Sequence, residues 1–259
     1  MKWITELHNK YKGQEIWIVG SDPSLENYPN DFLDNKLAIT LHLAYIKFPN
    51  ATFRYFNERD RFIFLKEKYP EILDKVSIFG YPFYNRSKEV SDEVIGEASK
   101  KAYYLDLKPY PPNGNYGAIF SDSGPNAMRK MVIEAVKATS KTFGGHGTCL
   151  HPCMYVAIMI GCNPINIIGC NFKNIEGKEH FGETNKIDHD MRPSMPSFTG
   201  HRSKRMTRGL KAIIAGCNDH KIKVNLIEKY DQKTKELVYK HTEPPKKPEP
   251  KKVSGFNPL

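Results

Sequence analysis

The stretch Glu15–Leu25, EIWIVGSDPSL, decides the fold, because a short apolar run ends there at a glycine and a turn. The run EIWIV is rich in β-branched and aromatic residues, which is typical of a buried strand. Gly20 lets the chain turn sharply and lets backbone N–H groups face a ligand, and Ser21 and Ser24 add hydroxyl groups. The other two glycines of G-x-G-x-x-G are missing, which argues against a dinucleotide site. An ordinary β-to-α turn explains the same residues.

Outward from this stretch, further short apolar runs alternate with helical patterns. Strands are expected at Lys36–Leu41, Thr52–Phe56, Val76–Phe79, Pro164–Gly169 and Lys223–Ile227. Helices are expected at Met1–Lys12, at Asp60–Tyr69, at Asn126–Ser140 with Asn126 as N-cap, from near Pro152 to about Ile160, and at Ser203–Asn218. This alternation predicts one α/β, Rossmann-like domain over residues 1–242, with a mostly parallel sheet and helices on both faces.

Two segments depart from this rhythm. Gly80–Asp122 carries Pro82, Pro109, Pro111 and Pro112 among scattered Tyr and Asn, which predicts a long irregular insertion that acts as a lid or acceptor-binding wall. A surface excursion without a role is the alternative. From residue 243 to 259 the Pro/Lys composition cannot form a core, so we expect a mobile, basic tail.

The composition indicates a globular chain, with 39% hydrophobic and 26% charged residues among 259. We expect no membrane span and no secretory signal, because the apolar runs are short and the first residues lack an apolar centre. The cysteines are odd in number and lie in the apolar second half, which favours buried free thiols and a cytoplasmic protein. They are Cys149, Cys153, Cys162, Cys170 and Cys217.

The formal net charge of +10 favours anionic partners such as nucleotides or anionic glycolipid. A solvated basic surface explains the charge as well. Nucleic acid is not an expected partner, because the sequence has no zinc-finger spacing, no aromatic RNA-binding pattern and no basic reading helix.

A glycine-rich loop, Gly144–Pro152, feeds the expected helix near Pro152. Free N–H groups and the helix dipole make such a loop a candidate anion site. Three interpretations of its side chains stay open: Cys149 as a nucleophile with a histidine partner, a metal site, or packing of Cys149 and Cys153 at a helix–sheet junction. The metal ligands would be His146, Cys149, His151 and Cys153.

Two more motifs follow at the exits of later elements. One predicted strand ends at Gly169, Cys170 and Asn171, and ligands of open α/β sheets bind at such strand ends. Asn171 suits this role because an asparagine can both donate and accept hydrogen bonds. The loop Lys173–Asp190 is expected to be charged and to lie over the site. His201 stands at the start of a helix, where it is either a general base or a capping residue.

Taken in order, these motifs resemble those of the bacterial inverting, metal-independent sialyltransferases. That family has a G-N-G-P-S-L opening, an S-G-I-D-F-type strand exit and a G-H-S-K segment with its catalytic histidine. Here the corresponding letters are G-S-D-P-S-L, I-I-G-C-N-F and G-H-R-S-K, spread over roughly Gln14–Glu228. The opening loop and the strand exit are similar in the same way to the 6-hydroxymethylpterin diphosphokinase-like Rossmann domains.

The resemblance implies a role for each matching residue. Gly20, Ser21 and Ser24 would line the nucleotide phosphate and sugar, His42 and Asn57 would bind the donor, Thr148 and Cys149 would contact the sugar, and Gly169, Cys170 and Asn171 would hold the cytidine. His201 would be the catalytic base, and Lys173 would stabilise the leaving phosphate in place of a family tyrosine. Ser21 and His42 replace family asparagines, and His146 falls near a family arginine, which leaves the donor sugar open.

The expected function is therefore glycosyl transfer from a nucleotide-activated sugar, a CMP-sugar, to a glycan acceptor, in cell-surface glycan biosynthesis. We expect no metal and no cofactor beyond the sugar nucleotide. Peripheral contact with membrane glycolipid and a homo-oligomer built on the aromatic stretch Tyr81–Tyr116 are further expectations. Two alternatives remain: pyrophosphoryl transfer from ATP to a pterin-like alcohol, with magnesium on Asp22 and Asp190, and a catalytically inactive nucleotide-binding module.

Overall fold

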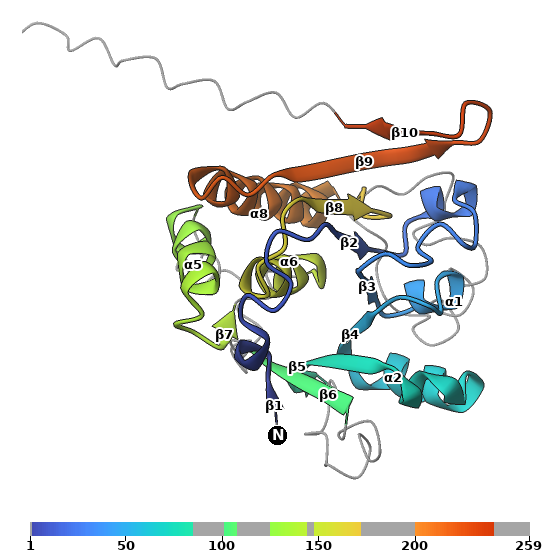
Figure 1. The fold of residues 1–259 in the computed structure, drawn as a ribbon, viewed down its shortest axis with the longest axis horizontal. Helices are drawn as coiled ribbons and strands as arrows, with labels where there is room; N and C mark the ends of the chain where they lie inside the picture. Colours follow the sequence, from blue (N-terminus) through green and yellow to red (C-terminus); the bar gives the residue numbers. More distant parts are fainter. Residues whose placement is uncertain (1, 85–100, 108–124, 144–147, 172–199, 241–259) are drawn as a thin grey trace, which may run out of the picture.

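The computed structural model describes residues 2–84, 101–107, 125–143, 148–171 and 200–240, and these form one α/β sheet structure (Figure 1). Ten strands in this part of the chain form one sheet in the order β1-β6-β5-β4-β3-β2-β8-β9-β10, with β7 beside β6. All strand pairs are parallel except β9–β10. The strands are β1 (Lys2–Trp3), β2 (Ile16–Val19), β3 (Ala38–Leu41), β4 (Phe53–Glu58), β5 (Val76–Tyr84), β6 (Ala102–Leu107), β7 (Thr142–Phe143), β8 (Ile165–Ile168), β9 (Val224–Asp231) and β10 (Glu236–Tyr239).

Helices cover both faces of this sheet, as predicted. α5 (Pro125–Lys137), α6 (Leu150–Met159) and α8 (Gly200–Asp219) lie on one side, and α1 (Ala44–Lys47) and α2 (Arg59–Lys68) lie on the other (Figure 1). Three short 3-10 helices complete the layers: η1 (Ile4–Leu7), η2 (Pro23–Asn27) and η3 (Pro70–Asp74).

The central strands are buried on both faces, which explains their mostly apolar sequence. In β2, Ile16 and Ile18 belong to the core that contains α5, α6 and α8. Trp17 and Val19 point to the opposite face and pack with η2. Because successive side chains alternate between faces, every residue of β2 meets apolar neighbours.

The sheet reverses its direction of growth between β2 and β8. From β2 the chain adds β3, β4, β5 and β6 outward on one side, and it then returns through α5 and α6 to place β8 on the other side of β2. The carboxyl ends of β2 and β8 therefore flank a topological switch point, where open α/β sheets bind ligands.

Three sequence-based expectations about individual elements are wrong in detail. The first residues form β1 and η1 rather than one helix over Met1–Lys12, because Lys2 and Trp3 pair with β6 and Asn9 adopts a positive φ of 57°. Asn126 lies inside α5, which begins at Pro125, a residue that suits the first helical position. The strand expected at Lys223–Ile227 continues to Asp231, and a further strand, β10, follows it.

The expected insertion Gly80–Asp122 contains regular structure. β5 continues through Pro82 to Tyr84, and β6 pairs with it inside the sheet. The pairing of β5 with β4 shifts register beyond Phe56, and proline is tolerated in strands at such irregularities. Residues 85–100 and 108–124, and the tail 243–259, lie outside the described residues.

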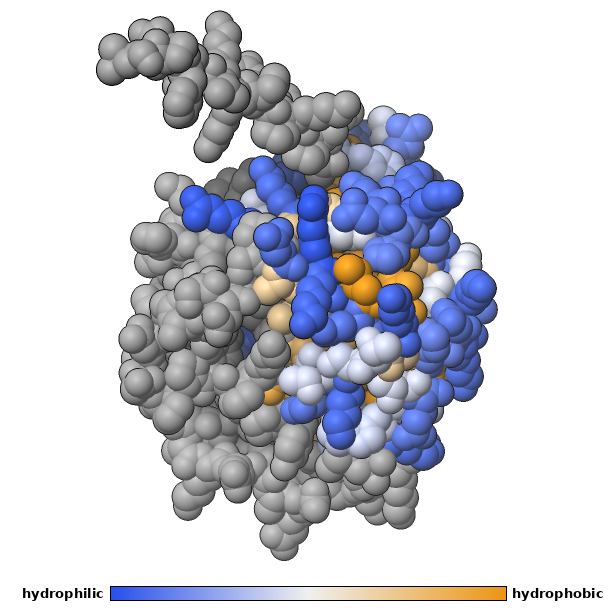
Figure 2. All heavy atoms as spheres, turned by 90° about the vertical axis from the view of Figure 1, so that its left-hand side faces the viewer, coloured by the Kyte–Doolittle hydropathy of each residue, from blue (hydrophilic) through white to orange (hydrophobic). Residues whose placement is uncertain are grey.

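One side of the described surface is mostly polar. Figure 2 shows the side that lies on the left in Figure 1, and its coloured part is largely hydrophilic with a small hydrophobic area. Among the described residues, the exposed large hydrophobic side chains are Ile133 of α5 and Tyr239 of β10. None of the helices in the described part of the chain is long and apolar enough to cross a membrane.

All five cysteines are free thiols, and Cys153, Cys162 and Cys217 are buried, as the sequence predicts. Burial raises the pKa of Cys162 and that of Cys217 from 9.0 to about 12. The native chain therefore keeps these protons while the unfolded chain releases them above pH 9. Stability is present below pH 9 and is lost as the pH rises toward 12.

We expect the free energy of unfolding to fall by about 1 kcal/mol for each of these thiols between about pH 8 and pH 10. Urea unfolding at the two pH values measures the fall. In Cys162→Ala the fall should be smaller than in the wild type by about that amount. An equal fall in both chains would show that ionisation of Cys162 is not linked to unfolding.

Candidate nucleotide and transfer site

The loops that follow β2 and β8 touch through their backbones. The Gly20 N–H donates to the Ile168 carbonyl at 2.9 Å, and the Asp22 N–H donates to the Gly169 carbonyl at 3.0 Å. A Cβ atom on Gly20 would lie 2.1 Å from the Gly169 oxygen, and Gly169 has a φ of +63°. Both positions therefore require glycine, Gly20 because of the close approach and Gly169 because of the left-handed backbone.

A polar group ties these two loops to β9. Asp22 caps η2, because its Oδ1 accepts the Ser24 N–H at 2.9 Å. The amide nitrogen of Asn171 donates to Asp22 Oδ1 at 3.3 Å, and it lies 3.5 Å from Ser24 Oγ. The same nitrogen donates to the carbonyl of Glu228 in β9 at 3.1 Å. Asn171 thus positions the loop after β2, in addition to the binding role that the resemblance implies.

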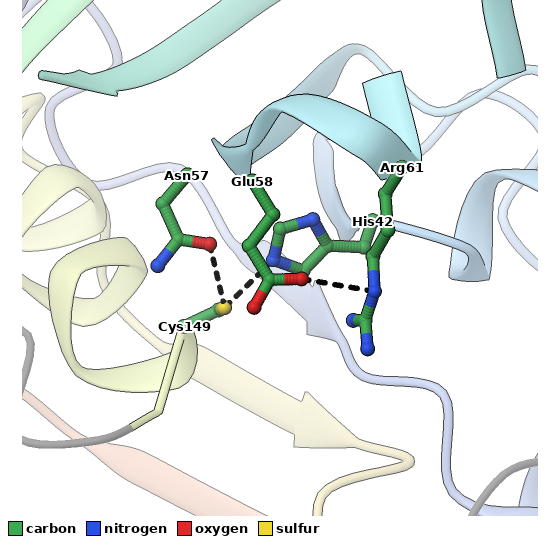
Figure 3. Close-up of polar contacts among 5 residues, drawn as sticks. All are labelled: His42, Asn57, Glu58, Arg61 and Cys149. Atoms are coloured by element: carbon green, nitrogen blue, oxygen red, sulfur yellow. Dashed lines mark hydrogen bonds and ion pairs between the residues drawn. The ribbon is translucent and has the colours of Figure 1, made fainter. Parts of the chain in front are cut away.

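A second polar group lies at the carboxyl ends of β3 and β4, where three predicted donor-binding residues meet (Figure 3). Cys149 Sγ is 2.8 Å from His42 Nε2 and 3.2 Å from Asn57 Oδ1. His42 directly follows β3, Asn57 is the penultimate residue of β4, and Cys149 directly precedes α6. The structure therefore supplies the histidine partner for Cys149 that the sequence left unnamed.

The local fold fixes His42 in place. Its backbone turns into the left-handed region with a φ of 45°, which costs a non-glycine residue free energy. The backbone N–H still donates to the Tyr55 carbonyl at 3.1 Å. The ring is 3% exposed and meets the rings of Phe56 and Tyr55 edge-on. A strained residue held this firmly is typical of functional sites.

An ion pair borders this group. Arg61 Nε lies 3.0 Å from Glu58 Oε2, and both side chains are largely buried. Figure 3 shows the pair beside His42 and Cys149. Sequence reasoning missed both residues of the ion pair. Glu58 lies two residues beyond the predicted strand Thr52–Phe56, and Arg61 is the second residue of the predicted helix Asp60–Tyr69.

The remaining predicted residues have more local surroundings. Thr148 Oγ1 accepts the Leu150 N–H at 3.2 Å and so supports the start of α6. Ser21 is half-buried beside Gly20. Burial, with the nearby Asp22 carboxylate, raises the pKa of the Cys170 thiol, while a hydrogen bond with the Gly20 backbone opposes this rise. His201 is in the first turn of α8, but its side chain, like Lys173, His146 and Asp190, lies outside the described residues.

Two of the proposed metal ligands belong to the core. His151 is fully buried, and its Nε2 lies 3.2 Å from the Met206 carbonyl in α8. Cys153 is also fully buried, and burial raises its pKa. Within the described ranges, no three His, Cys, Asp or Glu side chains form a group that could hold a metal ion.

A hollow of about 580 Å³ lies elsewhere, at the amino-terminal edge of the sheet. Its lining includes Lys36, Leu37 and Thr52, which precede β3 and β4. Ligands of open α/β sheets bind at the carboxyl ends of the strands. The hollow is therefore separate from the candidate site.

Comparison of the chain with protein-family models, with curated proteins and with solved structures yields no match.

Proposed function

We propose that this chain binds a nucleotide-activated sugar, a CMP-sugar, and transfers the sugar to a glycan hydroxyl with inversion. The observation that supports this most strongly is the switch point, where Gly20 and Gly169 bring two loops into backbone contact. This contact places both loops at the carboxyl ends of adjacent parallel strands, where open α/β sheets bind their ligands. The loops after β2 and β8 would hold the nucleotide.

The group formed by His42, Asn57 and Cys149 would receive the donor sugar. It lies at the same edge as the nucleotide loops, because β3 and β4 run parallel to β2 and end on that edge. These side chains offer a ring nitrogen, an amide and a thiol to sugar hydroxyl and carboxylate groups. Thr148 would add a hydroxyl beside them.

The transfer step would form one bond and break one. The acceptor oxygen attacks the anomeric carbon of the donor, the bond from that carbon to the phosphate oxygen breaks, and CMP leaves with the electron pair. His201 would take the acceptor proton as general base. Lys173 would stabilise the charge that develops on the phosphate. Ser21 would donate to the same phosphate.

The proposal extends to the surroundings of the site. The stretch Gly80–Asp122, part of which lies outside the described residues, would supply the lid or acceptor-binding wall. The acceptor would be a glycan, with peripheral contact to membrane glycolipid from the cytoplasmic side. A homo-oligomer through the region Tyr81–Tyr116 belongs to the same proposal.

The ATP-dependent alternative needs Asp22 and Asp190 as magnesium ligands, and the surroundings of Asp22 disfavour metal binding there. Asp22 is 5% exposed, and its Oδ1 already accepts hydrogen bonds from Ser24 and Asn171. A magnesium ion would need oxygen ligands that are free to point at it. In a thermal-shift comparison we therefore expect CMP, rather than ATP with magnesium or UDP, to raise the melting temperature. A shift with ATP and magnesium alone would favour the pyrophosphoryl transferase.

Asn171→Asp is expected to weaken CMP binding at least about tenfold, or about 1.4 kcal/mol. The substitution places a carboxylate about 3 Å from Asp22 and near the proposed phosphate site, and like charges repel at that distance. Calorimetric titration with CMP measures the effect.

Asn50→Asp is the matched control. Asn50 donates its amide to Asp34 Oδ1 at 3.2 Å, but on the opposite edge of the sheet. The control should bind CMP within about twofold of the wild type, since its new charge is distant from the site. Equal affinity in both variants would contradict the proposed position of the nucleotide.

A further inference from the structure

We propose that Cys149 is a nucleophilic thiol, held with His42 as a thiolate–imidazolium pair, and that it is a site of covalent modification by small soft electrophiles. This reactivity is separate from sugar transfer and does not depend on it. The geometry that supports it is the distance of 2.8 Å from Cys149 Sγ to His42 Nε2. That separation is within the reach over which a base takes the proton of a nucleophile.

The surroundings of the sulfur favour its charged form. Cys149 is the N-cap of α6, a helix of ten residues, and the positive end of a helix dipole stabilises a thiolate. Asn57 lies 3.2 Å away, and its amide has both a donor and an acceptor end. Asn57 can therefore pair with the thiol through its oxygen and with the thiolate through its NH₂ group.

The described charged and titratable neighbours of Cys149 do not cancel the stabilisation of its thiolate. Glu58 of β4 faces Arg61 of α2, and their opposite charges pair at 3.0 Å. Among the residues that the structure describes, the thiols of Cys153 in α6 and Cys170 after β8 also interact electrostatically with Cys149. Burial keeps both of these thiols neutral, because it raises the pKa of each.

Exposure makes the reaction selective. Cys149 is half-buried, whereas Cys153, Cys162 and Cys217 are buried. Cys170 is half-buried as a residue, yet its raised pKa keeps it as a thiol at neutral pH. Since the thiolate is the reacting species, Cys149 should react far ahead of the other four cysteines.

Iodoacetamide is the probe. The sulfur attacks the methylene carbon, the S–C bond forms, and iodide leaves with the electrons of the C–I bond. The proton that left the sulfur stays on His42 until the buffer removes it. Mass spectrometry of peptides gives the labelling rate of each cysteine in the folded chain and in urea, from about pH 6 to pH 9.

We expect Cys149 in the folded chain to react at least about tenfold faster at pH 6.5 than the same cysteine in urea, since an ordinary thiol has a pKa of about 8.5. In His42→Asn this advantage should disappear, and the rate should follow the pH dependence of an ordinary thiol. Asparagine tolerates the positive φ at this position, so the variant keeps the backbone turn. Asn57→Asp should also slow the reaction, because a carboxylate beside the sulfur disfavours the thiolate.

Cys149→Ser should abolish the fast labelling and so assign it to this residue. The proposal is overturned if folded Cys149 reacts no faster than the unfolded thiol at pH 6.5. It is also overturned if both His42→Asn and Asn57→Asp, shown to be folded by circular dichroism, keep the wild-type rate.

Discussion

Gly20→Ala is expected to lower the free energy of unfolding by about 3 kcal/mol, the upper part of the range for overpacking substitutions. The added methyl group would lie 2.1 Å from the Gly169 oxygen and 2.4 Å from Cys170 Sγ. The first of these contacts is with backbone, which cannot rotate away as a side chain can. The loops after β2 and β8 must therefore separate, which breaks the hydrogen bonds between them.

Gly13→Ala is the matched control for this substitution. Gly13 has a φ of +76°, but no atom lies within 4 Å of the position of its missing Cβ. Only the backbone cost of about 1 kcal/mol should appear. Urea unfolding of the two variants compares them directly. Equal losses of stability would mean that the two loops do not approach as closely as the structure indicates.

His201→Ala is expected to slow sugar transfer by about 10²- to 10⁴-fold, which is the usual contribution of a general base. CMP affinity should remain within about twofold of the wild type, because the base acts on the acceptor and not on the nucleotide. The assay measures CMP release from a CMP-sugar with a panel of glycan acceptors, alongside CMP titration. If His201→Ala keeps its CMP affinity, the slower transfer comes from the chemical step and not from weaker nucleotide binding.

His220→Ala provides the control for this prediction. His220 directly follows α8, whereas His201 lies in the first turn of that helix. The control should therefore keep wild-type transfer. Unchanged transfer in His201→Ala would remove the proposed base. CMP binding without transfer by the wild type would instead favour the inactive nucleotide-binding module.

The central strands could be predicted from sequence because burial on both faces makes most of their residues apolar. β2, β3 and β8 each bury all four residues, and each appears in the sequence as a short apolar run. β6 could not be found in this way, because half-buried Tyr103 and Asp106 interrupt its pattern. Its neighbouring prolines favoured an irregular segment.

β10 was missed for a different reason. It is a short edge strand whose four residues are exposed or half-buried, so it has no apolar pattern. The turn between β9 and β10 nevertheless has a recognisable sequence pattern. Asp231 accepts the N–H groups of Lys233 and Thr234, and an aspartate two residues before such donors is typical of a turn.

The candidate site was predictable residue by residue but not as an assembly. Asp22 could have been recognised as a helix cap, since Asp-Pro-Ser combines an N-cap with proline at the first helical position. The pairing of His42 with Cys149 spans 107 residues. It depends on the strand order, which places the end of β3 near the start of α6, and no local pattern encodes that order.

Hydrogen–deuterium exchange of the wild-type chain with and without CMP tests the central claim most directly, since it locates the nucleotide. Backbone N–H groups in segments that a bound ligand covers and stabilises should exchange more slowly, because local opening becomes rarer. We predict protection of the peptides that contain Gly20–Leu25 and Gly169–Asn171, with no change around Asp34–Thr52. Protection confined to Asp34–Thr52, or none at saturating CMP, would contradict a nucleotide site at the junction of β2 and β8.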